Sequence, residues 1–194
     1  MREFISPILL GALEHYGKFN ELKKSDLKLV CEMKVSDSGS AGNGPVDYIV
    51  TYKKTNIVLT EAKKDEIDKG VVQNLYQQVA SVQEVARSLK LTTSKKRKYE
   101  ERLADVEMIP SYGIVSTGDK WIFLCYWAGA DLGSPRLRIS EEIDYSLKNL
   151  KNFTVEANLE PTCNLIRMIA GIVKVQVDNM NEWEPKYKKD KEGG

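Results

Sequence analysis

Histidine and cysteine are scarce in this sequence, and the few that occur lie far apart. The 194 residues contain one histidine, His15, and three cysteines, Cys31, Cys125 and Cys163. Zinc sites of the usual type need Cys or His ligands at short spacings, so such a site is nearly excluded, as is any His-based triad that does not use His15. The odd cysteine count is typical of a reducing compartment with buried thiols, and Cys125 is expected in the core.

Long apolar runs and excess charge are also missing. No run approaches the roughly 20 apolar residues that span a bilayer, and the first ten residues are too short for a signal-peptide core. We therefore expect no membrane association and an intracellular protein, in the nucleus or the cytoplasm. The formal net charge of +1 neither indicates nor excludes nucleic-acid binding, because the clustering of basic residues on one face decides this.

Hydrophobic periodicity predicts an alternation of helices and strands. Ser6 and Pro7 are typical of a helix start, and Gly17 is typical of its end. In a later helix, the apolar residues recur at helical spacing and form an apolar stripe; they are Val71, Val72, Leu75, Val79, Val82, Val85, Ala86 and Leu89. The expected strands are at 27–33, 46–52, 56–61, 112–116, 121–126 and 136–139, with a loop at 36–44. Helices are expected at 67–89 and 162–177, and a shorter helix is expected to end near residue 106.

This order of elements predicts an α/β fold. It is typical of a three-layer sandwich in which helices flank a mixed central sheet. One domain is expected over residues 1–182, where hydrophobic residues recur throughout. Residues 183–194 are charged and end in glycine, so their composition predicts a disordered tail.

Three charged residues stand out because of their positions on two neighbouring strands. Asp47 is near the start of one predicted strand, and Glu61 and Lys63 end the next one. Side chains two residues apart on a strand share a face, so Glu61 and Lys63 project together. If residues 53–55 form a three-residue turn, counting back along both strands places Asp47 directly opposite Glu61. A two-residue turn would shift this register by one and spoil the pairing.

The pairing of Asp47 with Glu61 predicts a metal site. Carboxylates about 4.5–5.5 Å apart at their Cβ atoms repel each other unless a cation lies between them. Mg²⁺ prefers oxygen ligands, and a lysine beside it can orient an attacking water and offset phosphate charge. The alternative is that Glu61 and Lys63 form a solvated ion pair, a pattern common by chance. Asp47 at hairpin distance and the apolar interior of the Glu61 strand favour the metal site.

The stretch G-P-V-D ending at Asp47, followed by V-L-T-E-A-K ending at Lys63, resembles the PD-(D/E)xK nuclease superfamily. The resemblance covers about residues 14–79 and implies a restriction-endonuclease-like fold. It also implies that Asp47 and Glu61 bind Mg²⁺ or Mn²⁺ and that Lys63 assists phosphodiester hydrolysis. One departure is that Val46 stands between the proline and Asp47, which leaves the acid in place.

The resemblance also points to accessory residues. Many relatives carry a glutamate on the first helix that reaches the metal through water, which implies Glu14 as a further metal ligand, with His15 as second choice. Relatives also place a glutamine on the helix after E-x-K. Gln73 is the first candidate and Gln77 its support, because residues four apart share a helix face. The alternatives are an ordinary surface glutamate and solvent-facing amides.

Residues 61–78 further resemble the nuclease-like domains of Crinkler-type effectors and retrotransposon-hot-spot proteins. The expected function is a Mg²⁺-dependent nuclease acting on nucleic acid, with DNA favoured, and many relatives form homodimers. Lysines near residues 53–54, 63–64, 69 and 95–98 could line a phosphate track or simply be solvated, and the last run resembles a nuclear-import patch. The alternatives are a nuclease fold that binds nucleic acid or a protein without cutting, and a purely structural or interaction domain.

Overall fold

A mixed β-sheet organises the chain in the computed structural model, which describes residues 2–20, 26–34, 45–53, 55–88, 110–128, 135–145 and 155–192. Its seven strands run in the order β1-β2-β3-β4-β5-β6, and β7 pairs with β5. Only β3 and β4 are parallel neighbours in this sheet. The strands are β1 (Leu27–Lys34), β2 (Pro45–Tyr52), β3 (Thr55–Ala62), β4 (Pro110–Ser116), β5 (Lys120–Trp127), β6 (Arg136–Ile139) and β7 (Ile143–Asp144).

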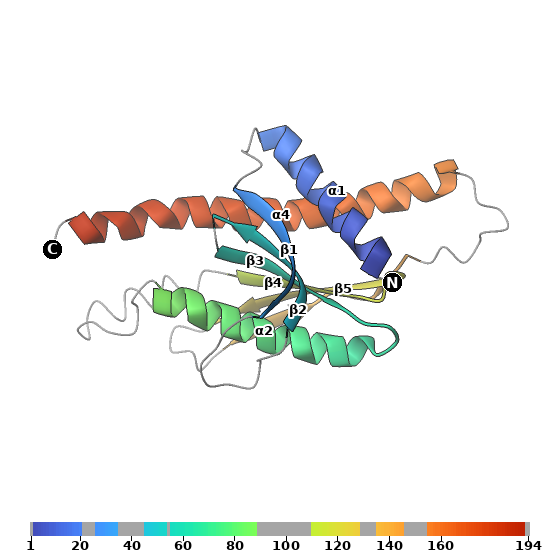
Figure 1. Cartoon of the computed structure of the whole chain (residues 1–194), viewed down its shortest axis with the longest axis horizontal. Coiled ribbons are helices and arrows are strands. Elements are labelled where there is room, and N and C mark those ends of the chain that lie inside the picture. Colours follow the sequence, from blue (N-terminus) through green and yellow to red (C-terminus); the bar gives the residue numbers. More distant parts are fainter. Residues whose placement is uncertain are drawn as a thin grey trace.

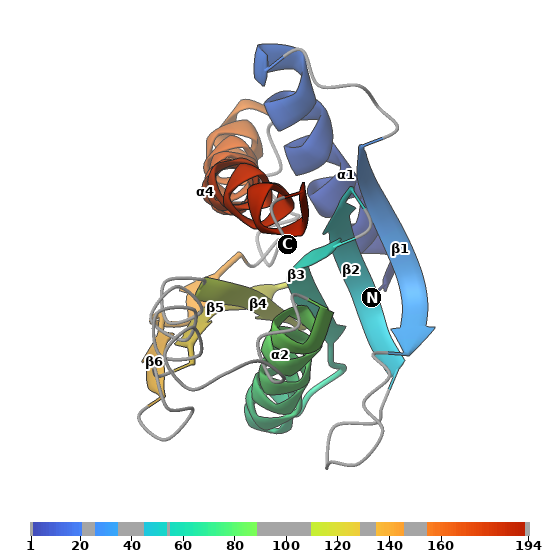
Figure 2. The same ribbon diagram turned by 90° about the vertical axis from the view of Figure 1, so that its left-hand side faces the viewer.

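Helices cover both faces of this sheet. The helices α1 (Arg2–Asn20) and α4 (Val155–Glu192) lie on one face, and α2 (Ile67–Ser88) lies on the other (Figures 1 and 2). The largest hydrophobic cluster joins α1 and α4 to the sheet, and smaller clusters join α2 to the opposite face. The α/β class and the three-layer sandwich with a mixed sheet are therefore confirmed.

Two helix boundaries differ from the sequence-based prediction. Helix α1 begins at Arg2 rather than at Ser6, contains Pro7 and continues past Gly17 to Asn20. Helix α4 begins at Val155, before the expected cap near residue 162. Ser6 and Pro7 predicted a helix start because proline is favoured at the first helical position. Inside a helix proline removes one backbone hydrogen bond, but burial of side chains such as Ile5 and Leu9 offsets that loss.

The same helix α4 extends through Glu192, so residues 183–192, expected as a disordered tail, belong to a helix. Lysine and glutamate are good helix formers, which makes a charged segment an ordinary continuation of an amphipathic helix. The expected loop at 36–44, the basic run at 95–98 and the short helix ending near residue 106 lie outside the described residues. The division of the chain at residue 182 stays a prediction.

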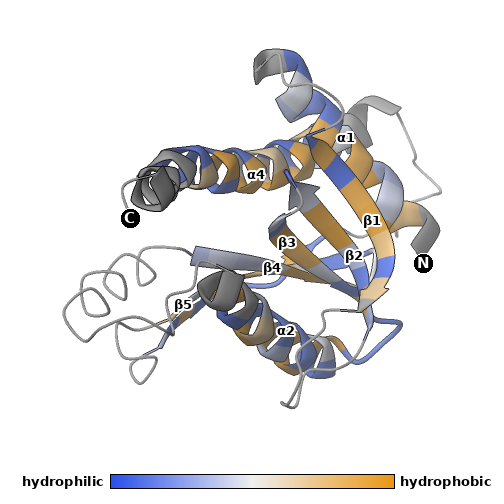
Figure 3. Ribbon diagram, turned by 60° about the vertical axis from the view of Figure 1, so that its left-hand side comes forward, coloured by the Kyte–Doolittle hydropathy of each residue, from blue (hydrophilic) through white to orange (hydrophobic). Residues whose placement is uncertain are grey.

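Helix α2 packs on the sheet through polar side chains as well as through the buried apolar residues Ala80 and Val82. The expected apolar stripe is buried only in part. Val72 is 54% exposed, and Leu75 and Val79 are only partly buried. Figure 3 shows hydrophilic and hydrophobic segments alternating along α2. The buried polar side chains of this helix are Asn74, Gln77, Gln78 and Ser81. The sheet under α2 offers hydrogen-bonding groups, which the sequence periodicity of α2 alone cannot show.

The thiols are less buried than predicted. Cys31 is exposed on the edge strand β1, and Cys125 and Cys163 are partly buried. Cys125 lies on β5 next to the edge strand β6, whose residues are exposed. Among the described helices, none is long and apolar enough to cross a membrane.

Candidate active site

The turn between β2 and β3 has two residues, not the three that the sequence-based register required. Tyr52 pairs with Thr55, so residues 53–54 connect the strands. A β-bulge then shifts the register between Val50 and Thr51, because Val50 pairs with Val58 whereas Thr51 pairs with Asn56. The extra residue is Ile57, whose side chain is buried. A bulge places two residues of one strand opposite one of the other.

The bulge restores the register that the shorter turn would have lost. Beyond it, Tyr48 pairs with Thr60, which is the last pair of this ladder and agrees with the register that the three-residue turn predicted. The ladder ends before Asp47 and Glu61, so their direct pairing stays a prediction, and the turn length predicted for it was wrong. The register up to Tyr48 comes from two compensating irregularities, each of one residue.

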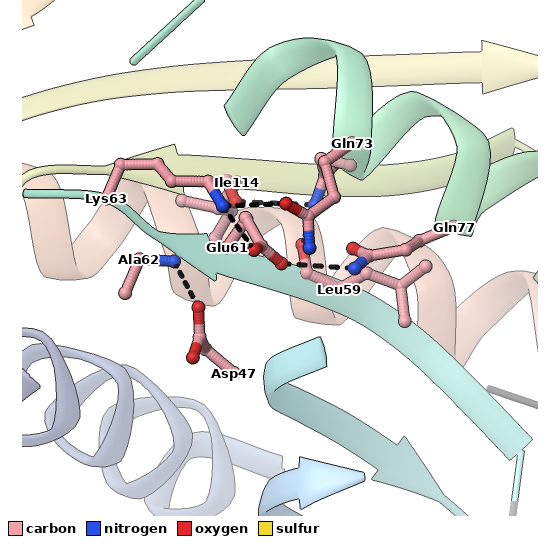
Figure 4. Close-up of polar contacts among 9 residues, drawn as sticks. Asp47, Leu59, Glu61, Ala62, Lys63, Gln73, Gln77 and Ile114 are labelled. Carbon is pink, nitrogen blue, oxygen red and sulfur yellow. Dashed lines mark hydrogen bonds and ion pairs between the residues drawn. The ribbon is translucent and has the colours of Figure 1, made fainter. Parts of the chain in front are cut away.

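Asp47 contacts the backbone of the E-x-K segment. Its Oδ2 accepts a hydrogen bond from the backbone N–H of Ala62 over 2.9 Å. Ala62 is the residue between Glu61 and Lys63, so Asp47 lies within one residue of both. In Figure 4 its carboxylate reaches β3 at Ala62, whereas the Glu61 carboxylate lies on the α2 side. The negative charge of Asp47 nevertheless reaches Glu61, since it contributes to raising the pKa of that carboxyl.

Glu61 is almost fully buried, with 2% of its surface exposed. Its Oε1 accepts a hydrogen bond from Lys63 Nζ over 2.8 Å, and its Oε2 accepts one from Gln77 Nε2 over 3.1 Å. Burial raises the pKa of the Glu61 carboxyl, and the hydrogen bonds from Lys63 and Gln77 and the charge of Lys63 only partly offset this effect. A cation placed beside the group would favour its charged form.

Lys63 is held from two sides. Besides the ion pair with Glu61, its Nζ donates to Oε1 of Gln73 over 2.7 Å (Figure 4). Its backbone N–H donates to the carbonyl of Ser116, which continues the parallel β3–β4 ladder. Gly70 makes the close approach of α2 feasible, because a Cβ there would lie 2.8 Å from Lys63 Cγ. A glycine in the first turn of α2 is thus required by the position of the lysine stem.

Gln73 and Gln77, the glutamines that the resemblance pointed to, contact Lys63 and Glu61 respectively. Gln77 is buried rather than solvent-facing, which contradicts the alternative interpretation of this side chain. Its Oε1 has no hydrogen-bond partner in the part of the chain that the structure describes. A buried acceptor without a donor costs free energy, so this atom offers an acceptor for a donor that enters the site.

Glu14 is not brought to this group. It is exposed on α1, and α1 lies on the face of the sheet opposite α2 (Figure 2). In the described part of the chain Glu14 makes no contact with Asp47, Glu61 or Lys63, so its role as a metal ligand has no structural support. His15, the second choice, is half-buried on the same helix.

The donor set is compatible with Mg²⁺ or Mn²⁺. Asp47 and Glu61 provide carboxylate oxygens near the end of β3, and carboxylate oxygens are ligands that Mg²⁺ prefers. Among the described residues no group of three or more His, Cys, Asp or Glu side chains could hold a metal ion. Mg²⁺ keeps several waters and often uses only one or two carboxylates, and the unpaired Gln77 Oε1 could accept a hydrogen bond from such a water.

A cavity adjoins this edge of the sheet. Its volume is about 470 Å³, and it is lined in part by Lys64, Asp65 and the turn that contains Asp119 and Lys120. Lys64 directly follows the E-x-K segment, so the cavity opens beyond the carboxyl end of β3. In open α/β sheets, ligands commonly bind beyond the carboxyl ends of strands.

Sequence reasoning missed Asn74 and Gln78. Both are fully buried on the sheet side of α2, and Gln78 Nε2 donates to Asn74 Oδ1 over 2.8 Å. The available signal was a second stripe of α2, in which polar residues recur at helical spacing from Asn74 to Ser81.

Comparison of the chain with protein-family models, with curated proteins and with solved structures found no match in any of the three.

Proposed function

We propose that this protein is a Mg²⁺- or Mn²⁺-dependent nuclease of the PD-(D/E)xK, restriction-endonuclease-like type, acting inside the cell on nucleic acid, with DNA favoured. The observation that carries the proposal is the arrangement at the end of β3. Glu61 and Lys63 are in direct contact, Gln73 and Gln77 bond to them from α2, and Asp47 bonds to the residue between them.

In this proposal Asp47 and Glu61 hold the metal ion. When bound, the metal would polarise the phosphodiester and lower the pKa of a coordinated water. Lys63 Nζ carries three N–H donors, so it can bond to the attacking water or to a phosphate oxygen while it stays oriented by Gln73. Hydrolysis forms one bond from the water oxygen to phosphorus and breaks one ester bond, and the leaving oxygen takes up a proton. A fixed cation offsets the charge that develops on phosphorus oxygens.

The second candidate function is binding without cleavage. It is favoured by the way the charged groups of the site satisfy one another: both Glu61 oxygens accept hydrogen bonds from the protein, and Asp47 is bonded to a backbone N–H. A site of this kind could stabilise the fold of a module that holds nucleic acid or a protein partner. Metal binding separates the two candidates, because only the nuclease requires the ion.

The test is incubation of the full chain with plasmid and with single-stranded DNA in Mg²⁺, Mn²⁺ or EDTA. Cleavage is expected with either metal and not with EDTA. The variants Asp47→Ala, Glu61→Ala and Lys63→Ala should lose cleavage while keeping the circular-dichroism spectrum of the fold. Lys174→Ala is the matched control, because Lys174 forms an exposed ion pair on α4, across the sheet. DNA binding without metal-dependent cleavage would support the second candidate instead.

A further inference from the structure

Asn74 connects α2 to both strands of the parallel pair. Its Nδ2 donates to the carbonyl oxygen of Leu59 on β3 over 3.0 Å and to that of Ile114 on β4 over 3.5 Å. The side chain is fully buried. One amide group therefore spans two neighbouring strands at the point where the helix crosses them.

The orientation of this amide is fixed by a second one. Gln78, one turn further along α2, donates from Nε2 to Asn74 Oδ1. Because the Asn74 oxygen accepts this bond, the Asn74 nitrogen must face the sheet carbonyls. The Oε1 of Gln78 is buried and has no partner within the described residues. The two amides are therefore buried although one acceptor oxygen lacks a hydrogen bond. This is expected where a buried polar pair fixes how a helix packs on a sheet.

Gly113 of β4 makes room for the pair. A Cβ at this position would come within 3.0 Å of Asn74 Oδ1 and of Gln78 Nε2. Gly113 pairs with Leu59, whose carbonyl Asn74 binds. The helix can approach the sheet this closely only because the residue under the two amides has no side chain.

The position of Asn74 along α2 links this contact to the candidate active site. It directly follows Gln73, which bonds to Lys63, and it lies three residues before Gln77, which bonds to Glu61. A helix is rigid over one turn, so fixing Asn74 against the sheet sets the height and rotation of both glutamines.

We propose that Asn74, seated on Gly113 and oriented by Gln78, is a positioning residue that holds Gln73 and Gln77 at hydrogen-bonding distance from Lys63 and Glu61. The inference rests on the proposed function only for its catalytic consequence. The geometric claim concerns Glu61 and can be measured in a protein that does not cleave DNA.

The experiment compares Asn74→Ala with the wild type in two-dimensional ¹H–¹⁵N spectra by following the side-chain amide signal of Gln77. This amide donates a hydrogen bond to the Glu61 carboxylate, so loosening α2 should move its N–H signal toward the position of a water-exposed amide. Cleavage should fall about tenfold through kcat or metal affinity, as for other groups that orient metal ligands, with KM for DNA unchanged. Ser81→Ala is the control, since Ser81 is buried on the same face of α2.

A second variant keeps the test decisive if Asn74→Ala is unstable. Gln78→Leu keeps most of the bulk of this side chain and removes the hydrogen bond that orients Asn74. The Gln77 amide signal is expected to move in the same direction as in Asn74→Ala. A folded variant whose Gln77 signal coincides with the wild type would overturn the proposal, and so would failure of both variants to fold, which would assign Asn74 a structural role only. Absence of cleavage in the wild type would instead refute the nuclease and leave the result for the amide signal standing.

Discussion

Gln77 on α2 donates its side-chain N–H to Oε2 of Glu61 on β3 over 3.1 Å, and both side chains are almost fully buried. This contact joins the helix layer to the acidic end of the sheet. It explains why polar side chains of α2 are turned inward beside apolar ones such as Ala80 and Val82.

Replacing Gln77 with leucine removes this hydrogen bond at nearly constant volume. Because the bond from Gln77 lowers the pKa of Glu61, its loss should raise that pKa and move the acidic limb of the cleavage–pH profile to higher pH. Cleavage at neutral pH should fall by about tenfold or more. Steady-state cleavage assays over a pH series measure both effects. Gln83→Leu on the same helix is the matched control, and an unmoved acidic limb in Gln77→Leu would contradict the prediction.

Glu61 should make the protein less stable as the pH rises. Its pKa in the folded state is raised above the ordinary value of 4.5, mainly by burial. Between the unfolded and folded pKa values the native state binds more protons than the unfolded state, so the free energy of unfolding falls with increasing pH. This favourable contribution is fully present below about 4.5 and is lost as pH passes through the folded pKa.

Urea unfolding over a pH series checks this sign. Glu61→Gln should show a weaker decline in stability across the window above 4.5 than the wild type does. Glu66→Gln, at an exposed residue paired with Lys69, should retain the decline of the wild type. Parallel curves for Glu61→Gln and the wild type would show that Glu61 does not carry the dependence.

Gly70 should not tolerate alanine. A Cβ at this position would lie 2.6 Å from Val115 Cγ1 and 2.8 Å from Lys63 Cγ, so α2 must lift from the sheet or Lys63 must move. We expect a loss of about 1–3 kcal/mol in the free energy of unfolding, together with reduced cleavage. Gly171→Ala is the control, because a Cβ there meets nothing within 4 Å. It should stabilise helix α4 by about 0.5–1 kcal/mol, and chemical denaturation of both variants decides the comparison.

Val72 should be replaceable despite its place in an apolar stripe. Its side chain is 54% exposed, and exposed substitutions usually change stability by less than about 0.5 kcal/mol. Val72→Gln should therefore unfold at nearly the same urea concentration as the wild type. Leu59→Ala, in the buried interior of β3, is the contrasting variant and should lose about 2–5 kcal/mol. A large loss in Val72→Gln would mean that the apolar stripe is buried after all.

The local part of the site was readable from the sequence. The two-residue period of a strand requires Glu61 and Lys63 to share a face, and the structure has them in contact over 2.8 Å. The strand positions were also readable, because β-branched and aromatic residues recur in segments such as β2 and β5. The catalytic role of these side chains stays a prediction.

The register of β2 against β3 next to Asp47 was inferred correctly from a wrong turn length. The sequence offers no signal that distinguishes a three-residue turn from a two-residue turn followed by a bulge at Ile57. Both routes add one residue to the same strand, so they give the same register beyond the bulge. Which route is taken depends on how Ile57 packs against the core.

The sequence by itself determined the element types, the alternation of helices and strands and the neighbouring positions of Glu61 and Lys63, because these follow from periodicity along a single segment. Only the tertiary structure decided that α2 turns its amides inward and that Glu14 lies across the sheet from them. The physical reason is that the burial of a helix face depends on the surface that it packs against. Under α2, the strands β3 and β4 present a carboxylate, backbone carbonyls and a glycine. The amide side chains of α2 can form hydrogen bonds with these groups.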